Sequence, residues 1–189
     1  MSEWDERAQS LLTEGSDAWD RGNRLQAEKL FRQVVQEFPN RPEGYNKVGV
    51  IFAETGQLQE AEQYFLMALT QDRSYAPALT NLGNILLERG QTDEAIQHYL
   101  LALQSDPDYP AAHRNLGVAY RRQGKYNSYV THFKRSQKLD DRRVRDEMRR
   151  RRVTGGGRST PAAGPRIPTF VWLILAAIGA VILLTVFRR

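Results

Sequence analysis

Residues 45–52 (YNKVGVIF) decide the fold, because the same pattern returns twice at a spacing of 34 residues. It reappears as residues 79–86 (LTNLGNIL) and as residues 113–120 (HRNLGVAY). In each copy a glycine sits among apolar residues that are three and four positions apart, the spacing of one face of an amphipathic helix. A period of this length indicates similar helical units that stack side by side.

A second glycine recurs in four places at the same spacing of 34 residues, and a second apolar set follows the first three of these glycines. The second glycines are Gly22, Gly56, Gly90 and Gly124. The second apolar sets are Ala27/Phe31, Ala61/Phe65/Ala68 and Ala95/Tyr99/Ala102. A glycine tolerates the left-handed backbone that ends a helix, so we expect a turn at each one. The predicted frames are 8–41, 42–75, 76–109 and 110–143, with residues 1–7 extending the first helix.

The 34-residue pattern resembles the tetratricopeptide repeat (TPR) family, whose unit is a helix–turn–helix. The resemblance covers residues 8 to about 143, roughly 70% of the chain. It implies an all-α fold, a TPR helix–turn–helix solenoid of about four repeats. One helix pair cannot bury its own apolar face, so neighbouring repeats complete the core. The resemblance also implies a ligand site on the concave face formed by the first helix of each repeat.

Small residues within each repeat predict a close helix–helix contact. We expect Gly49 and Gly83 to lie opposite Ala61 and Ala95, because small side chains let two helices approach. Two repeats depart from this pattern. Repeat 1 has Glu14 where later repeats have an apolar residue, as expected of a terminal repeat with one solvated face. Repeat 4 has Tyr129 in place of the alanine, so either its helices splay apart or the phenol points outward.

Polar residues occupy the positions that line the concave face in the TPR family. They are Asn46, Lys47, Asn81, Asn84, Arg114, Asn115, Arg121 and Arg122. A carboxamide both donates and accepts hydrogen bonds, which suits the backbone of an extended peptide. The alternative is that asparagine is simply common at this place in the repeat.

Three of these candidates are arginines spaced to share one face of the first helix of repeat 4. Arg114, Arg121 and Arg122 would suit an acidic segment or a C-terminal carboxylate. A solvated basic face is the alternative. The residue pattern by which some TPR proteins clamp the C-terminal carboxylate of chaperones is not matched, so that ligand is not expected.

Residues 170–187 (FVWLILAAIGAVILLTVF) are the one long stretch without a charge. Eighteen residues rise about 27 Å as a helix, close to the roughly 30 Å hydrocarbon core of a bilayer. We therefore predict a C-terminal transmembrane helix at residues 169–187, which makes the protein tail-anchored. A core helix buried in a large domain, or a signal for a lipid anchor, explains the stretch less well.

Between the repeats and the apolar stretch the chain becomes strongly basic. We expect residues 140–152 (DDRRVRDEMRRRR) to form a short helix that caps repeat 4 with Val144 and Met148. Residues 153–168 (VTGGGRSTPAAGPRIP) are predicted to be a flexible linker because glycine, proline and small polar residues dominate. The basic candidates are Arg142, Arg143, Arg145, Arg149, Arg150, Arg151 and Arg152.

This arginine cluster has three interpretations. Contact with anionic lipids is worth about 1 kcal/mol per arginine at a membrane surface. A pure topology signal is the second, because basic residues mark the cytoplasmic side of a transmembrane helix. Nucleic acid is the third and is not an expected partner, since interleaved aromatic residues are missing. The expected location is a single-pass membrane protein with cytosolic repeats, in a bacterial inner or thylakoid membrane rather than that of a eukaryotic organelle.

Catalytic and cofactor signals are missing from the sequence. It contains no glycine-rich phosphate loop and no cysteine. The histidines fit packing positions of the repeat better than metal ligands. We therefore expect no enzyme, no cofactor and no metal site. The expected function is a membrane-anchored scaffold that binds a protein or peptide, acidic segments being one option, and aids assembly of a membrane complex. The alternative is a structural subunit held in such a complex through its transmembrane helix.

Overall fold

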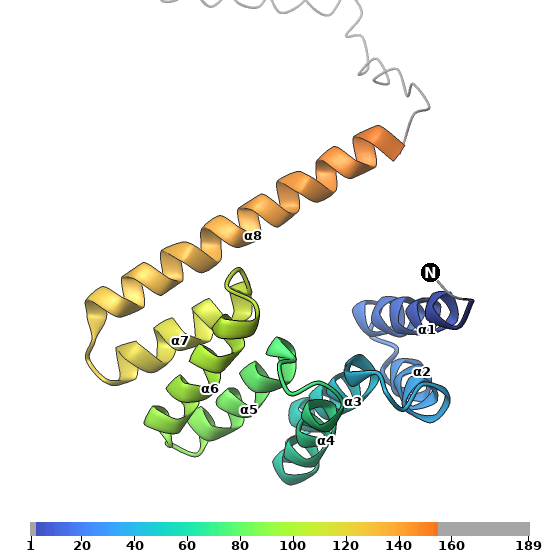
Figure 1. The fold of residues 1–189 in the computed structure, drawn as a ribbon, viewed down its shortest axis with the longest axis horizontal. Coiled ribbons are helices and arrows are strands. Elements are labelled where there is room, and N and C mark those ends of the chain that lie inside the picture. Colours follow the sequence, from blue (N-terminus) through green and yellow to red (C-terminus); the bar gives the residue numbers. More distant parts are fainter. Residues whose placement is uncertain (1–2, 155–189) are drawn as a thin grey trace, which may run out of the picture. The chain divides into compact units, whose positions relative to one another are not determined.

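The computed structural model describes residues 3–154, and within this range the chain forms helices and no strand (Figure 1). The helices are α1 (Glu3–Asp20), α2 (Arg24–Glu37), α3 (Pro42–Glu54), α4 (Leu58–Gln71), α5 (Ala76–Glu88), α6 (Thr92–Ser105), α7 (Pro110–Arg122) and α8 (Tyr126–Thr154). The expected all-α helical repeat is thus confirmed for the described residues. Residues up to Arg145 fall in one compact unit, and the chain from Asp146 falls in another.

A glycine in the left-handed conformation joins the two helices of every repeat. The φ angles of Gly22, Gly56, Gly90 and Gly124 lie between 74° and 83°. After α3 the N–H of Gln57 donates to the carbonyl of Phe52, and that of Gly56 donates to Ala53. These bonds form a Schellman motif, which satisfies carbonyls at the helix end. The same pair of bonds recurs at the other three turns, so all four repeats turn in the same way.

Within repeats 1 to 3, a glycine of the first helix lies under an aromatic ring of the second. A Cβ atom placed on Gly15, Gly49 or Gly83 would come within 2.5–2.6 Å of that ring. The rings belong to Phe31, Phe65 and Tyr99, which are at most 2% exposed. The atoms nearest to each glycine thus belong to a ring that lies one helical turn beyond the alanine position of the sequence pattern. The absent Cβ makes room for a flat ring, which buries more apolar surface than a methyl group does.

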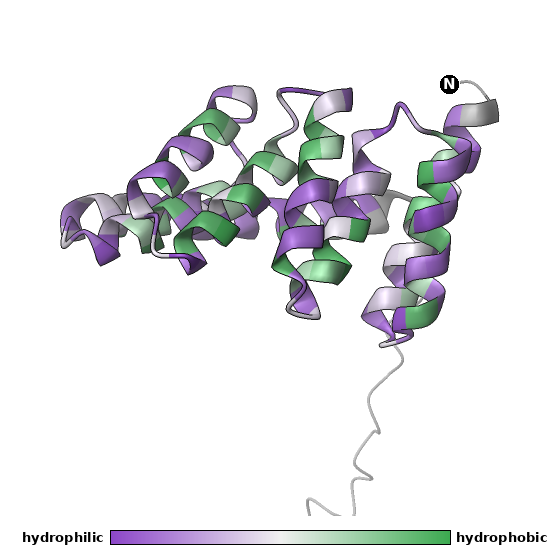
Figure 2. Ribbon diagram, turned by 90° about the horizontal axis from the view of Figure 1, so that it is seen from below, coloured by the Kyte–Doolittle hydropathy of each residue, from purple (hydrophilic) through white to green (hydrophobic). Residues whose placement is uncertain are grey.

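Successive repeats share their cores. Ala61, Phe65 and Ala68 of α4 pack with residues of α5, namely Ala78, Leu82 and Ile85. Ala95, Ile96 and Tyr99 of α6 likewise pack with α7 through Leu116 and Ala119. In Figure 2 the helices of the stack carry both hydrophobic and hydrophilic residues, as expected of helices with a packed face and an exposed face. Glu14 of the first repeat is exposed and accepts a hydrogen bond from Ser10, in keeping with a terminal face.

Repeat 4 closes differently. Its Gly117 faces Tyr129, whose backbone oxygen would lie 3.3 Å from an added Cβ. Both Tyr129 and Phe133 are only partly buried. The helices nevertheless stay packed, because Ser136 and Leu139 of α8 are buried. The close approach at Gly117 argues against a splayed pair, and the Tyr129 ring stays partly accessible beside the exposed Arg121.

Helix α8 is one continuous helix of 29 residues. Residues 140–152 are therefore helical, but they do not form a separate short helix. Pro39 and Pro107 follow the second helices of repeats 1 and 3, whereas the equivalent residue here is Asp141, which is compatible with a continuing helix. Val144 and Met148 are 47% and 59% exposed, so the predicted burial of these two side chains is wrong.

The predicted membrane segment lies outside the described residues. Among the helices of residues 3–154, none has the length and apolar character needed to cross a bilayer. The predicted linker is described only at residues 153–154, which belong to α8. The rest of the linker and the transmembrane helix predicted at 169–187 remain predictions.

Candidate functional site

The predicted ligand residues lie on α3, α5 and α7, the first helices of repeats 2 to 4. We call the surface formed by α1, α3, α5 and α7 the inner face. Two pockets open on it, one between α1 and α3 and one between α3 and α5.

The asparagines of the inner face bond first to one another. The Asn81 side-chain amide donates to Oδ1 of Asn46 at 2.9 Å, which links α5 to α3. The Asn115 amide donates to Oδ1 of Asn84 at 2.7 Å, which links α7 to α5. Asn84 also accepts from the hydroxyl of Tyr99 at 2.9 Å. These amides therefore join neighbouring repeats, and only their remaining donors and acceptors are open to a ligand.

The pocket between α1 and α3 has a volume of about 310 Å³. Lys47, Glu43 and Tyr75 line it together with Asp17 and other residues of α1. The Lys47 ammonium lies 5.5 Å from the centre of the Phe31 ring, a cation–π contact. Burial, and next the charge of Glu43, raises the pKa of Tyr75 far above its ordinary value. The phenol therefore stays protonated and keeps a hydroxyl that can donate.

Glu43 in this pocket has an oxygen, Oε2, that is buried without a hydrogen-bond partner. A buried acceptor that loses water and gains nothing in return costs about 1–3 kcal/mol. The repeat pattern places Glu43 among the ligand positions of α3, but it was not chosen as a candidate, since an acidic side chain in the first turn of a helix is expected for electrostatic reasons alone. Its position next to the ligand-lining residues of α3 was the available signal.

The pocket between α3 and α5 has a volume of about 230 Å³. Val50, Ala53 and Ile85 contribute apolar surface to it, with Leu58 and Phe65 from α4. Its polar residues are Asn81, Asn84, Glu54 and Glu88. Glu54 is paired with Arg24 at 3.6 Å. The arrangement offers an apolar socket beside amides and carboxylates.

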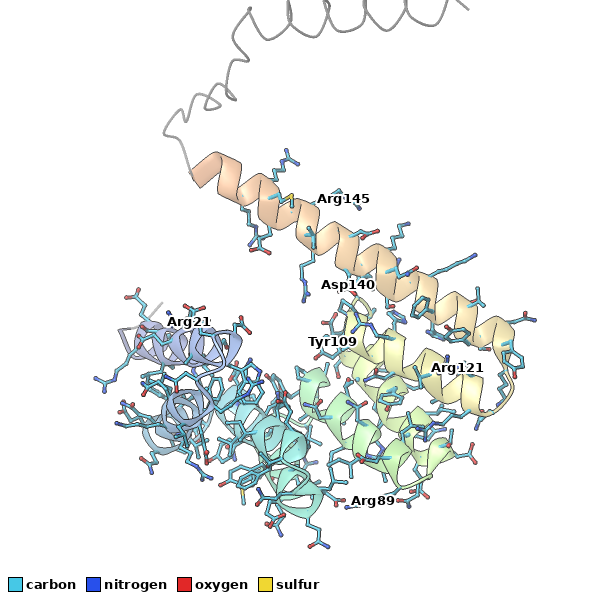
Figure 3. All side chains as sticks on the ribbon, turned by 180° about the vertical axis from the view of Figure 1, so that it is seen from behind. Arg21, Arg89, Tyr109, Arg121, Asp140 and Arg145 are labelled. Carbon is cyan, nitrogen blue, oxygen red and sulfur yellow. The ribbon has the colours of Figure 1, made fainter. Side chains whose placement is uncertain are left out.

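The three arginines of α7 have separate partners. Arg114 forms an ion pair with Asp140 of α8 at 2.5 Å. The Arg121 guanidinium lies 5.4 Å from the centre of the Tyr129 ring, also on α8. Figure 3 labels Arg121 on α7 and Asp140 on α8. Arg122 donates to the backbone carbonyl of Leu87 on α5. The structure thus does not gather them around one carboxylate pocket, and two of them hold α8.

A histidine pair that the sequence did not predict joins α7 to α8. The Nδ1 atoms of His113 and His132 are 3.0 Å apart, and Nε2 of His113 lies 3.0 Å from the carbonyl of Pro107. A carbonyl only accepts, so His113 carries its proton on Nε2 and accepts from His132 at Nδ1. Burial, and next the charge of His113, lowers the pKa of His132.

The basic residues of α8 extend along its exposed second half. The side chains of Arg142, Arg143, Arg145, Arg149 and Arg150 are exposed, and those of Arg151 and Arg152 lie outside the described side chains. Arg142 and Arg143 come within 4.0 and 3.8 Å of Asp108 and Asp140. Among the described residues there is no group of three or more side chains suited to hold a metal ion.

Models of one family match three overlapping parts of the chain. A model described as TPR repeat matches residues 83–124, and two described as tetratricopeptide repeat match residues 12–77 and 64–97. Together they span more than half of the chain. No curated protein sequence matches the chain.

Solved structures with the same fold include a Pseudomonas aeruginosa pilF structure, which is 26% identical with a TM-score of 0.64. That match covers 74% of this chain and 64% of the pilF chain. A MamA crystal structure is 23% identical with a TM-score of 0.56, covering 73% of this chain and 81% of that one.

A mutant O-GlcNAc transferase of Thermobaculum terrenum is 29% identical, also with a TM-score of 0.56. The match covers 64% of this chain but 23% of the transferase, so it carries no catalytic activity over to this chain.

Proposed function

We propose, from its membership of the tetratricopeptide repeat family, that this chain is a membrane-anchored scaffold that binds a protein or peptide segment along its inner face. The fold itself is one that generally serves protein–protein interaction. The finer parts of the proposal are the place of binding, the anchor and the contact with lipids. Each rests on a separate observation and has a separate test.

The observation that carries the binding site is the pair of neighbouring pockets on the inner face. One lies between α1 and α3 and the next between α3 and α5, so successive side chains of one extended segment can enter them. Accessible amide groups of Asn81 and Asn84 line the second pocket. Side-chain amides can form hydrogen bonds with the backbone of an extended peptide, and the adjoining pocket can select one of its side chains.

Site-specific photo-crosslinking in native membranes tests this site. Benzoylphenylalanine in place of Thr13, an exposed residue of the first pocket, should crosslink to a discrete partner. The matched control is the same substitution at Gln63, an exposed residue of α4 that lines neither pocket. Equal crosslinking from both positions would remove the inner face as the binding site.

The anchor rests on the composition of residues 170–187, of which twelve are Leu, Ile, Val or Phe. Such side chains at the centre of a helix favour insertion by about 0.3–0.6 kcal/mol each. The full chain should therefore stay in membranes washed with alkaline carbonate, and a chain ending at residue 154 should not.

Exchange of residues 170–187 for an unrelated apolar helix distinguishes the scaffold from the alternative of a structural subunit. A scaffold keeps its partner after the exchange, whereas a subunit held by its helix leaves the complex.

The lipid contact rests on the exposed arginines of α8. Five of them lie between residues 142 and 150, and all five side chains are exposed. A chain ending at residue 154 should bind vesicles that contain phosphatidylglycerol and not vesicles of phosphatidylcholine alone. The binding should weaken at high salt, because surface charges are screened within about 10 Å at 0.1 M.

A further inference from the structure

The inner face carries charge of one sign in its first part. Asp17, Glu43, Glu54 and Glu88 line the two pockets, and Lys47 is the one base among the residues that line them. Glu54 is already paired with Arg24. Within residues 3–154 the carboxylates of Asp17 and Glu88 have no ion pair, and one oxygen of Glu43 has no hydrogen-bond partner. This part of the inner face therefore has spare negative charge.

Glu43 is the group that most needs a ligand. Its Oε2 atom is buried beside a pocket that is large enough for the end of a lysine or arginine side chain. Lys47 is one helical turn away, but its ammonium group lies over Phe31. The groups that satisfy a buried carboxylate best are cationic donors, because charge-assisted bonds are about twice as strong as neutral ones. The ring of Tyr75 in the same pocket offers a second contact for a cation.

The next pocket calls for a different side chain. Its surface from Val50, Ala53 and Ile85 is apolar, and its volume is about 230 Å³. An apolar side chain of leucine or methionine size is favoured here, because its burial removes apolar surface from water. Glu88 at the edge keeps this pocket acidic, so an apolar residue next to a base fits better than one next to an acid.

We propose that the inner face between α1 and α5 binds an extended segment of a partner protein that carries a lysine or arginine and, a few residues away, an apolar residue. The base enters the pocket at Glu43, and the apolar side chain enters the pocket between α3 and α5. This inference rests on the proposed function and specifies its ligand. The acidic ligand expected from the sequence belonged to the arginines of α7, which instead contact α8 and the carbonyl of Leu87.

The test uses full-length protein in detergent micelles and labelled ten-residue peptides. Each peptide has a glycine–serine background with one arginine and one leucine, and the spacing between the two varies across the set. Matched peptides carry citrulline, which keeps the shape of arginine without its charge, or glutamate. Fluorescence anisotropy should reveal an arginine–leucine spacing that binds at least tenfold more tightly than its citrulline match, and the glutamate peptides should not bind.

Two variants locate the contact. Glu43→Gln should weaken the best arginine peptide about tenfold and remove its preference over citrulline. Glu60→Gln is the control, because Glu60 also lies in the first turn of a helix but is exposed and outside both pockets. The thermal midpoint of Glu43→Gln should equal or exceed that of the parent, since the change keeps the shape of a partly buried side chain whose Oε2 has no partner to lose. Loss of binding with unchanged stability assigns a ligand role rather than a structural one.

Three results would overturn the inference. They are equal binding of arginine and citrulline peptides, an unchanged affinity in Glu43→Gln, and binding that appears only after the chain from residue 155 is removed. The last result would assign the site to residues 155–189 of this chain instead of a partner. Crosslinking from Thr13 without any arginine preference would leave the proposed function standing and this inference refuted. Failure of both experiments would refute the two together.

Discussion

Repeats 1 to 3 and repeat 4 use the same helix–turn–helix for different kinds of packing. In the first three, a buried ring of Phe31, Phe65 or Tyr99 covers a glycine. In the fourth, the equivalent Phe133 is only partly buried, and polar contacts such as His113–His132 and Arg114–Asp140 hold the second helix. A close-packed interior tolerates few changes of volume, whereas polar surface contacts respond to pH and salt. The stability of repeats 1 to 3 should therefore depend on side-chain volume, and that of repeat 4 on pH and salt.

Loss of the ring should separate the two regions most clearly. Phe65→Ala removes a side chain that is 1% exposed and should lower the free energy of unfolding by about 3–5 kcal/mol. Phe133→Ala should cost only about 1–2 kcal/mol, because its ring has less surface to lose. Urea unfolding followed by circular dichroism measures both. Similar losses in the two variants would mean that repeat 4 is packed as tightly as the others.

Added volume under the ring should have the next largest effect. In Gly83→Ala the new Cβ would lie 2.5 Å from the ring of Tyr99, which is fully buried and bonded to Asn84. Overpacking of this kind costs about 1–3 kcal/mol. Gly117→Ala has its nearest neighbour at 3.3 Å and gains up to about 1 kcal/mol of helix propensity, so the two should nearly cancel. A greater loss in Gly117→Ala than in Gly83→Ala would reverse the comparison.

Acid should act on repeat 4 before the others. The pKa of His132 is lowered in the folded protein, so the unfolded chain binds the proton more readily. This contribution to stability is complete above the unfolded pKa of about 6.5 and decreases as the pH falls below it. The protection factors of α8 amides, which compare each exchange rate with the intrinsic rate at the same pH, should therefore be lower at about pH 5.5 than at pH 7.5, with little change in α3 to α5. His132→Gln removes the titrating group and should abolish the difference.

The exposed ion pairs should matter least. Arg114→Ala breaks the pair with Asp140, whose side chains are 49% and 32% exposed. Such pairs are worth roughly 0–1 kcal/mol, and less at high salt. Thermal unfolding should show that Arg114→Ala is less stable than the parent at low salt and nearly as stable as the parent at high salt. A loss above that range at high salt would show that Arg114 packs α8 by more than charge.

The sequence predicted the repeat well because periodicity and turn chemistry are local. Gly56 and Gly90 have the left-handed φ angles that their spacing implied. The sequence could not predict which residue of the second helix lies nearest to each glycine of the first. Periodicity predicts the buried face of a helix, but not which residue of that face makes a given contact. Alanine and phenylalanine lie one turn apart on the same face, and only the packing shows that Phe65, not Ala61, covers Gly49.

The ligand residues show the same limit. Asn81 and Asn115 share one place in the repeat, yet Asn81 donates to Asn46 and Asn115 donates to Asn84, which sits one turn further along its helix. Equal sequence positions therefore have different partners. The unpartnered oxygen of Glu43 and the contact between His113 and His132 depend on distances between helices, which a single sequence does not contain.

The turn glycines make whole blocks of the chain exchangeable. Every connection within a repeat has three residues and the same backbone geometry, so joining the chain at Gly56 and Gly90 deletes 34 residues and sets α6 directly after α3. Gly49 would then meet Tyr99 in place of Phe65, a difference of one hydroxyl group. Recombination between genes can thus lengthen or shorten such a chain without redesigning an interior. The length of the peptide segment that the inner face can bind would then change by one pocket per repeat, and not by one residue at a time.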